Sequence, residues 1–172
     1  EEMMLVYEMN GQPLQPQHGY PLRLLLPGWY GMASVKWLDR IEAVGNQFQG
    51  YQMAKAYRYT QDTEEPGEPV TLIRVRALMI PPGIPDTMTR VRWMTAGQHS
   101  LTGRAWAGRL GVSRVEVSVD DGSTWSEATL GEQVSTFAWR EWSFDWNAVP
   151  GWHTLSVRAT GIEENVQPID QF

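Results

Sequence analysis

The chain has 172 residues, no cysteine and a formal net charge of −6 at pH 7. This length permits one large domain or two small ones, and the missing cysteines exclude disulfides, thiolate metal sites and a cysteine nucleophile within the chain. The acidic balance argues against a general nucleic-acid-binding protein, because neutralising phosphates requires a basic face. No apolar run reaches the length of about 18 residues that a membrane-spanning helix needs.

The first predicted element is a β-hairpin. Leu5 to Met9 has the composition of a strand, and Asn10-Gly11 supplies the positive φ angles of a tight two-residue turn. Because a domain seldom begins inside such a hairpin, this opening favours a chain that is a piece of a longer protein.

The stretch from His18 to Trp37 holds the strongest candidate site. It gathers an imidazole, a guanidinium, a hydroxyl and an ammonium, from His18, Arg23, Ser34 and Lys36. These groups lie among glycines, which let a backbone approach a ligand closely. The pattern predicts an anion site, such as one for the phosphate of a large cofactor. The alternative is a buried strand with a turn and solvated cations at its ends.

The next part of the chain is less regular. Leu38 to Val44 alternates weakly and predicts a strand. Gln47 to Arg58 fits either a short helix or a long covering loop. Thr60 to Pro69 is acidic and rich in Pro and Gly, which predicts a linker.

From Val70 onward the pattern predicts an antiparallel β-sandwich. Short apolar or alternating runs recur between turn signals, at 71–77, 88–94, 100–106, 113–119, 135–146 and 154–160. In the fourth run Val115, Val117 and Val119 should face the core. His99 is expected in a loop, without a catalytic role. The polar tail either leaves the sandwich without its last strand or wraps an edge.

Both halves of the chain resemble one family. The segment NGQPLQPQHGYPLRLLLPGWYGMASVKWL (10–38) resembles the C-terminal part of the molybdopterin-binding domain of sulfite oxidases and their bacterial relatives. GRAWAG (103–108), SRVEVSVDDGSTW (113–125) and SVRATGIEENVQP (156–168) resemble the immunoglobulin-like dimerisation domain of the same family. The resemblance implies a mixed fold. Residues 1–66 would be the end of an α+β molybdopterin domain, and residues 67–172 an immunoglobulin-like all-β sandwich, truncated or not at its end.

The resemblance also implies site residues. The family uses a molybdenum–molybdopterin cofactor with a terminal phosphate, and His18, Arg23 and the run Ser34-Val35-Lys36 match the positions that hold it. The family binds its metal through a cysteine thiolate, so this chain offers no metal ligand. Arg109 follows GRAWAG in an unusual register and is a candidate for binding a substrate anion. The alternative for Arg109 is an arginine of a surface loop.

The resemblance predicts the C-terminal portion of a sulfite-oxidase-type oxidoreductase. The parent enzyme would oxidise sulfite, pass electrons to a haem protein such as a cytochrome or to another acceptor, and form a homodimer. Its partners would include the remaining N-terminal part of the same enzyme, and the family favours a periplasmic location. Two alternatives stay open. One is a non-catalytic dimerisation module, and the other is a relative that acts on sulfane sulfur or another oxide.

Overall fold

The computed structural model describes residues 3–60 and 64–168. The chain divides into two compact units, one ending at Ile73 and the other beginning at Arg74. The ordered elements of both units are mainly β-strands, and the described residues contain no α-helical element. None of their helices is long and apolar enough to cross a membrane.

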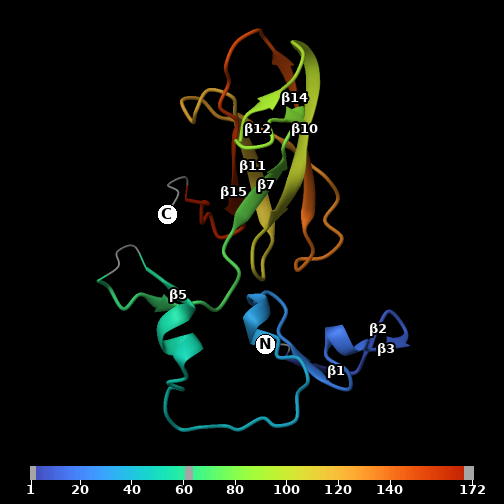
Figure 1. Ribbon diagram of the computed structural model, residues 1–172, viewed down its shortest axis with the longest axis vertical. Helices are drawn as coiled ribbons and strands as arrows, with labels where there is room; N and C mark the ends of the chain where they lie inside the picture. Colours follow the sequence, from blue (N-terminus) through green and yellow to red (C-terminus); the bar gives the residue numbers. More distant parts are fainter. Residues whose placement is uncertain (1–2, 61–63, 169–172) are drawn as a thin grey trace. The chain divides into compact units, whose positions relative to one another are not determined.

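The first unit consists of short elements joined by turns (Figure 1). Its strands form three two-stranded sheets, β1 with β4, β2 with β3 and β5 with β6. In chain order the elements are β1 (Met4–Val6), β2 (Glu8–Met9), β3 (Gln12–Pro13), the 3-10 turn η1 (Pro16–His18), β4 (Arg23–Leu25), the 3-10 turn η2 (Gly31–Ala33), the π-helical turn η3 (Gln52–Ala56), β5 (Arg58–Tyr59) and β6 (Glu68–Pro69).

The predicted hairpin is confirmed. β2 pairs with β3, and Asn10 and Gly11 between them have φ angles of 54° and 74°. The predicted strand over 38–44 is wrong, because only Leu38 bonds to a neighbouring segment, through its N–H to the Leu22 carbonyl, and residues 39–44 form an exposed stretch without strand pairing. The predicted linker over 60–69 differs at its end, where Glu68 and Pro69 form β6 and pair with β5, while 61–63 lie outside the described residues. Arg58 holds this pair, donating to the carbonyls of Met53, Pro66 and Gly67.

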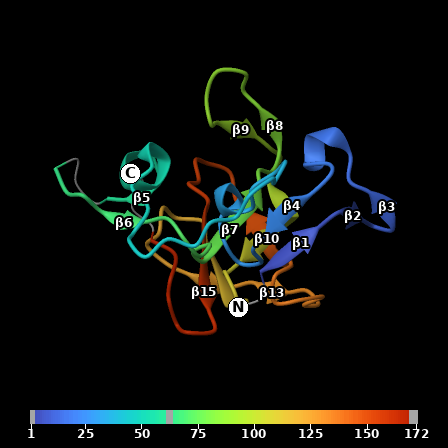
Figure 2. The same cartoon turned by 90° about the horizontal axis from the view of Figure 1, so that it is seen from below.

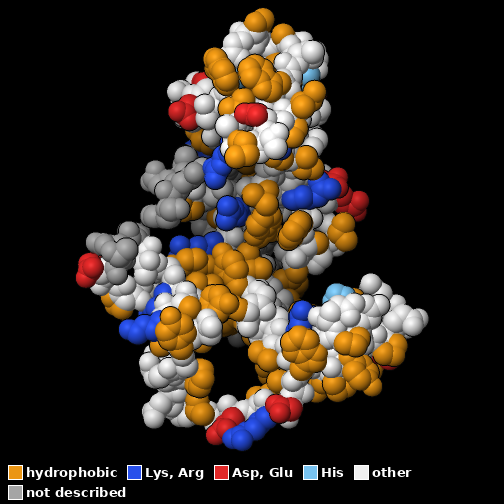
Figure 3. All heavy atoms as spheres, in the orientation of Figure 1, with side chains coloured by type: hydrophobic (Ala, Val, Ile, Leu, Met, Phe, Trp, Pro, Cys, Tyr) orange, Lys and Arg blue, Asp and Glu red, His pale blue; other side chains and the backbone are white. Residues whose placement is uncertain are grey.

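The first unit has little apolar core. Among its described residues only one hydrophobic side chain is buried, that of Leu14. Large apolar side chains instead lie exposed along the opening strands, at Met4, Leu5, Tyr7 and Met9. Figure 3 shows these hydrophobic groups gathered over the segment from β1 to β3. Hydrogen bonds rather than burial therefore hold this unit together.

The second unit is a sandwich of two antiparallel sheets. The four-stranded sheet has the order β13-β14-β10-β7 and the three-stranded sheet the order β12-β11-β15, with the small β8–β9 hairpin outside both (Figures 1 and 2). The strands are β7 (Arg76–Ile80), β8 (Ile84–Pro85), β9 (Arg92–Trp93), β10 (Gly97–Trp106), β11 (Val112–Ser118), β12 (Ser126–Glu127), β13 (Thr129–Leu130), β14 (Arg140–Ala148) and β15 (Ser156–Gly161).

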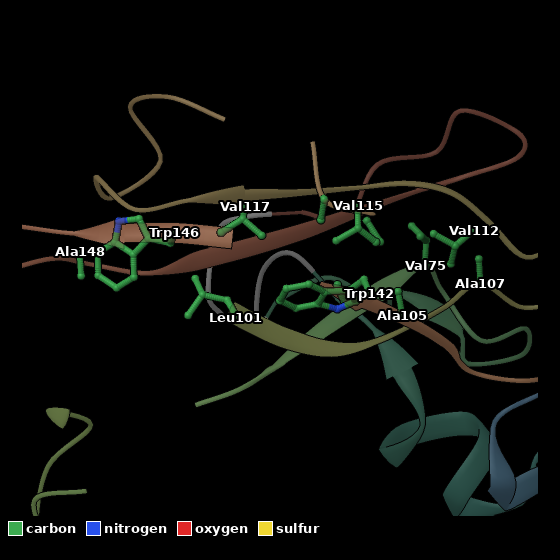
Figure 4. Close-up of a cluster of buried hydrophobic side chains, with 13 residues drawn as sticks. Val75, Leu101, Ala105, Ala107, Val112, Val115, Val117, Trp142, Trp146 and Ala148 are labelled. Atoms are coloured by element: carbon green, nitrogen blue, oxygen red, sulfur yellow. The ribbon is translucent and has the colours of Figure 1, made fainter. Parts of the chain in front are cut away.

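The core lies between these two sheets. Figure 4 shows Trp142 and Leu101 of one sheet on the side that faces Val115 and Val117 of the other. Trp142 is opposite Gly103 in the register of β14 and β10, and a Cβ at Gly103 would collide with the Trp142 ring and the Leu78 carbonyl. The glycine of the GRAWAG segment thus makes room for the largest core side chain.

Three predictions for the sandwich need correction. The strand expected over 88–94 is only β9, Arg92–Trp93, because it pairs locally with β8 rather than with a sheet. The strand expected over 135–146 begins at Arg140, after a loop. His99, expected in a loop, lies in β10 opposite Trp146, and its Nε2 is 2.8 Å from the Thr95 carbonyl oxygen.

The C-terminal segment connects the edges of the two sheets. The backbone N–H of Gln167 donates to the Ala159 carbonyl of β15 at 2.9 Å. Its side-chain Oε1 accepts from the backbone N–H of Ala77 in β7 at 2.6 Å. We call this pair of bonds the Gln167 bridge. The described part of the tail, up to residue 168, therefore lies along an edge of the sandwich, which agrees with one of the two alternatives left by the sequence.

Candidate functional site

The candidate site is built on η1, β4 and the segment that follows η2. Leu24 N–H donates to the Val35 carbonyl at 2.8 Å, and Leu38 N–H donates to the Leu22 carbonyl at 2.8 Å. These two bonds hold the segment 34–38 alongside β4. Two adjacent segments consequently hold four of the predicted site residues: β4 holds Arg23, and the segment 34–38 holds Ser34, Val35 and Lys36. The fifth, His18, lies in η1.

Arg23 joins the segments. Its Nη1 donates to the His18 carbonyl at 3.2 Å and its Nη2 lies 3.5 Å from the Ser34 carbonyl. Its Nε is buried and has no hydrogen-bond partner among the described residues. A buried donor without a partner is costly, and a charged one more so. An anion placed at this nitrogen would satisfy it, so this part of the site fits a phosphate or another polar edge of a cofactor.

The polar atoms of Ser34 and Val35 mainly form hydrogen bonds with the protein backbone. Ser34 is only 8% exposed, and its Oγ accepts from the Leu26 N–H at 3.2 Å. The Val35 carbonyl is already used by Leu24, while the Val35 side chain is exposed. Ser34 therefore links the end of β4 to the segment 34–38 that runs beside it.

Lys36 is exposed, and its ammonium group is anchored at one point. Its Nζ donates to the Gln17 carbonyl at 2.8 Å. An ammonium has three N–H donors, so two remain for an anion. From Asn10 to Leu38 the chain carries two cationic side chains, Arg23 and Lys36, and no carboxylate. The site is thus locally positive in a chain whose net charge is −6.

Gly19 allows the cationic residues to approach η1. Its φ is 105°, a conformation that side chains disfavour. A Cβ built there would lie 3.0 Å from Lys36 Cβ and 3.2 Å from Arg23 Cβ. The sequence suggested that glycines here make room for a ligand. At Gly19 the structure shows that the space is taken by the protein's own side chains.

Sequence reasoning missed the partners of these groups. The carbonyls of Pro16 and Gln17 and the indole of Trp37 belong to the same hydrogen-bond set, since Trp37 Nε1 donates to the Pro16 carbonyl at 2.9 Å. The only signal in the sequence is the adjacency of Trp37 to Lys36. We call the set formed by Gly19, Arg23, Lys36 and the η1 carbonyls the cationic cradle.

Arg109 is not part of the cationic cradle. It lies in the second unit, in the turn between β10 and β11, where Gly111 N–H donates to the Ala107 carbonyl at 3.1 Å. Its role in binding a substrate anion stays a prediction. The described residues contain no cluster of three or more His, Asp or Glu side chains that could hold a metal ion.

Comparison with known proteins links both units to one group of enzymes. Residues 73–172 match the family model described as the Mo-co oxidoreductase dimerisation domain. The chain belongs to this family. Residues 1–52 match a second model, the oxidoreductase molybdopterin binding domain, which contains the whole cationic cradle. The resemblance to sulfite oxidases is confirmed, and the matched domains imply a molybdenum–molybdopterin cofactor, as predicted.

Individual relatives cover almost all of the chain. Mitochondrial sulfite oxidase of Homo sapiens is 32% identical over 97% of the chain. Inducible nitrate reductase [NADH] 2 of Glycine max is 29% identical over 97%. The crystal structure of the sulfane dehydrogenase SoxCD from Paracoccus pantotrophus matches 98% of the chain with a TM-score of 0.80 at 25% identity. The chain spans 32%, 21% and 42% of these proteins, respectively.

Proposed function

We propose that this chain is the C-terminal portion of a molybdenum-cofactor-dependent oxidoreductase of the sulfite oxidase type. The observation that carries the proposal is the cationic cradle, which lies within the match to the molybdopterin-binding domain. Residues 1–66 would complete that α+β domain, and residues 67–172 would form an immunoglobulin-like sandwich that pairs subunits. The remaining part of the molybdopterin domain would cover the exposed apolar side chains of β1 to β3.

In this proposal Arg23 and Lys36 hold the terminal phosphate of the cofactor. Arg23 offers its unpartnered Nε, and Lys36 offers the two ammonium donors that Gln17 leaves over. His18 and the Ser34-Val35 backbone border the same site. The bound cofactor supplies the two-electron chemistry. This chain supplies no thiolate to the metal, because its sequence contains no cysteine.

The proposed reaction is oxidation of a small sulfur oxyanion. Sulfite takes one oxygen atom from water and yields sulfate, two protons and two electrons. The electrons would pass singly to a haem protein such as a cytochrome. Sulfite is favoured because sulfite oxidases are prominent among the relatives, whereas the solved structure is named for sulfane sulfur. Sulfite, a sulfane-sulfur substrate and nitrate, compared with the native protein, would separate these classes.

Cofactor content tests the proposal. We expect the native protein that carries this chain to retain molybdenum and pterin, and Arg23→Met and Lys36→Met each to lower the pterin retained. Pterin is measured by the fluorescence of its oxidised form and molybdenum by elemental analysis. Arg114→Met is the matched control, because Arg114 lies on a strand of the sandwich and pairs with Glu116. Unchanged cofactor content in both cradle variants would refute the assignment.

Activity provides a second test. We expect the isolated 172-residue chain to oxidise no sulfite with any acceptor, because the family's thiolate ligand is missing from its sequence. The measurement is reduction of a cytochrome by sulfite, with the native protein as the positive control. Turnover by the isolated chain, verified free of any longer enzyme, would contradict the proposed division of roles.

The proposed assembly is a homodimer, as the family description of the second unit suggests. Exposed aromatic groups of the sandwich, including Trp139 and Trp152, are suited to interfaces. Trp139 stacks on Trp106 with ring centroids 5.1 Å apart. Sedimentation at several concentrations should give a dimeric mass. A monomer at every concentration would count against pairing and against the alternative of a purely structural dimerisation module.

A further inference from the structure

Trp37 has a backbone conformation that calls for an explanation. Its φ is 53°, in the left-handed region that bulky residues rarely adopt. Its ring is not held by burial, because the residue is 61% exposed. The hydrogen bond from its Nε1 to the Pro16 carbonyl, at 2.9 Å, is the contact that fixes the ring. We therefore connect the unfavourable φ of Trp37 with the hydrogen bond that its indole makes to η1.

Three successive carbonyls of η1 accept from three side chains of the site. The Pro16 carbonyl accepts from Trp37, the Gln17 carbonyl from Lys36 and the His18 carbonyl from Arg23. The Pro16 carbonyl also accepts from the Gly19 N–H at 3.1 Å, which closes the turn. Carbonyls at the end of a helical turn, here those of Gln17 and His18, are available to side-chain donors and attract cations. The carbonyls of η1 thus act as a template: they fix the positions of the Arg23 and Lys36 side chains relative to each other.

Lys36 depends on this template more than Arg23 does. Its side chain is long, exposed and anchored by a single bond to Gln17. A free lysine side chain loses considerable rotamer entropy when it is ordered by a ligand. Trp37 is the next residue, and Lys36 Nζ lies 5.9 Å from the centroid of its ring. Fixing Trp37 to Pro16 therefore fixes the backbone from which Lys36 reaches Gln17.

We propose that Trp37 is a positioning residue for the phosphate of the cofactor. It touches no phosphate itself. Its bond to Pro16 holds the Lys36 ammonium in place before the anion binds, which lowers the entropic cost of binding. This inference rests on the proposed function, because it assigns the phosphate to Lys36 and Arg23.

The test compares Trp37→Phe with Lys36→Met and with the double variant in the native protein. The readout is the rate at which bound pterin is lost after dilution, followed by pterin fluorescence. Trp37→Phe keeps an aromatic side chain and removes the N–H, so we expect loss to be about fivefold faster, as for one neutral hydrogen bond. Lys36→Met should accelerate loss about 10- to 100-fold, as for a charge-assisted bond.

The double variant identifies the positioning role. If Trp37 acts through Lys36, the double variant loses pterin no faster than Lys36→Met alone, because the two effects are coupled. Additive effects would overturn the inference, since Trp37 would then act independently of Lys36. Trp93→Phe is the matched control, because Trp93 is 62% exposed and lies in β9 of the second unit. It should leave the loss rate unchanged.

A further variant separates the ring from the backbone strain. Trp37→Gly relieves the positive φ, so the turn itself should fold at least as well as before. We expect an unchanged denaturation midpoint with faster pterin loss. A slower or equal loss rate would overturn the inference. If Lys36→Met and Arg23→Met also left pterin retention unchanged, the proposed function itself would fail. If only the Trp37 variants were silent, the failure would be confined to the positioning role.

Discussion

The two units of this chain are stabilised by different interactions, one mainly by apolar burial and the other mainly by hydrogen bonds. Among the described residues, the sandwich encloses a cluster of 13 buried apolar residues between its two sheets. The described residues of the first unit bury one hydrophobic side chain, Leu14, and rely on side-chain bonds to backbone carbonyls. Burial is non-directional and tolerant, whereas such bonds fix positions. The comparison teaches that a site for a charged ligand can sit on a scaffold that is ordered by polar contacts.

The largest expected effect is in the sandwich. Trp142 is 2% exposed, and Trp142→Ala should destabilise the second unit by about 3–5 kcal/mol through a cavity. Urea denaturation, followed by separate probes for the two units, measures this. Val134→Ala, at a position that is 83% exposed, is the control and should change stability by less than about 0.5 kcal/mol. An equal shift of the urea midpoint in both units would contradict this difference between them, because it would show that they share one core.

The next effect concerns the first unit. Gly19→Ala combines a disfavoured φ with close contacts to Lys36 and Arg23, so we expect a local cost of about 1–3 kcal/mol. Amide hydrogen exchange of Leu24 and Leu38 should become faster, while β11 in the sandwich stays protected. The control is Gly45→Ala, where no atom lies within 4 Å of the added Cβ. Faster exchange in β11 as well would contradict the independence of the units.

A smaller effect is expected at the Gln167 bridge. Gln167→Ala removes the acceptor of the Ala77 N–H, which should cost about 1–2 kcal/mol. The urea midpoint of the second unit measures it. Gln98→Ala, at an exposed position of β10, is the matched control. No difference between the two variants would show that the bridge adds nothing to the sandwich.

The smallest effect depends on pH. The hydrogen bond from Arg158, at 2.9 Å, lowers the pKa of Glu116 below its ordinary 4.5. Thr124 and Ser118 lower the pKa of Asp120 to about 2 from 3.8. Both groups therefore contribute stability that is complete above their ordinary pKa values. That stability is lost as the pH falls through the folded values.

Glu116→Gln and Asp120→Asn test this pH dependence. Each should be less stable than the wild type at pH 6, and the difference should shrink on acidification, for Asp120 between pH 3.8 and about 2. Urea denaturation across this range measures the differences. Asp121→Asn removes a carboxylate from the same turn and serves as the control. Differences that stay constant with pH would show that the protonation of Glu116 and Asp120 is not linked to folding.

Local signals in the sequence were the reliable ones. Asn10-Gly11 has a φ requirement that specifies its turn, and the alternation of Val115 and Val117 specifies their burial. The segment 38–44 failed because a weak alternation does not supply a pairing partner, and it stays exposed. A strand needs a neighbour as well as a pattern.

The sequence indicated the charged side chains of the candidate site but not the atoms that they contact. Arg23 and Lys36 stand out in the sequence because they are cations among glycines. Their bonds to the His18 and Gln17 carbonyls could not be predicted, since backbone carbonyls are the same at every position. Only the turn of η1 directs those carbonyls toward the cations. The hydrogen bond of Trp37 to the Pro16 carbonyl was hidden for the same reason.

The Gln167 bridge also has a consequence for synthesis on the ribosome. β7 is the edge strand of its sheet, and its bond to Gln167 spans 90 positions of the chain. At about 5–20 residues per second, the outer edge of β7 stays open for roughly 5–20 s after it emerges. An open strand edge is a template for pairing with another nascent chain. Closely spaced ribosomes on one message therefore place this edge at risk until Gln167 has emerged.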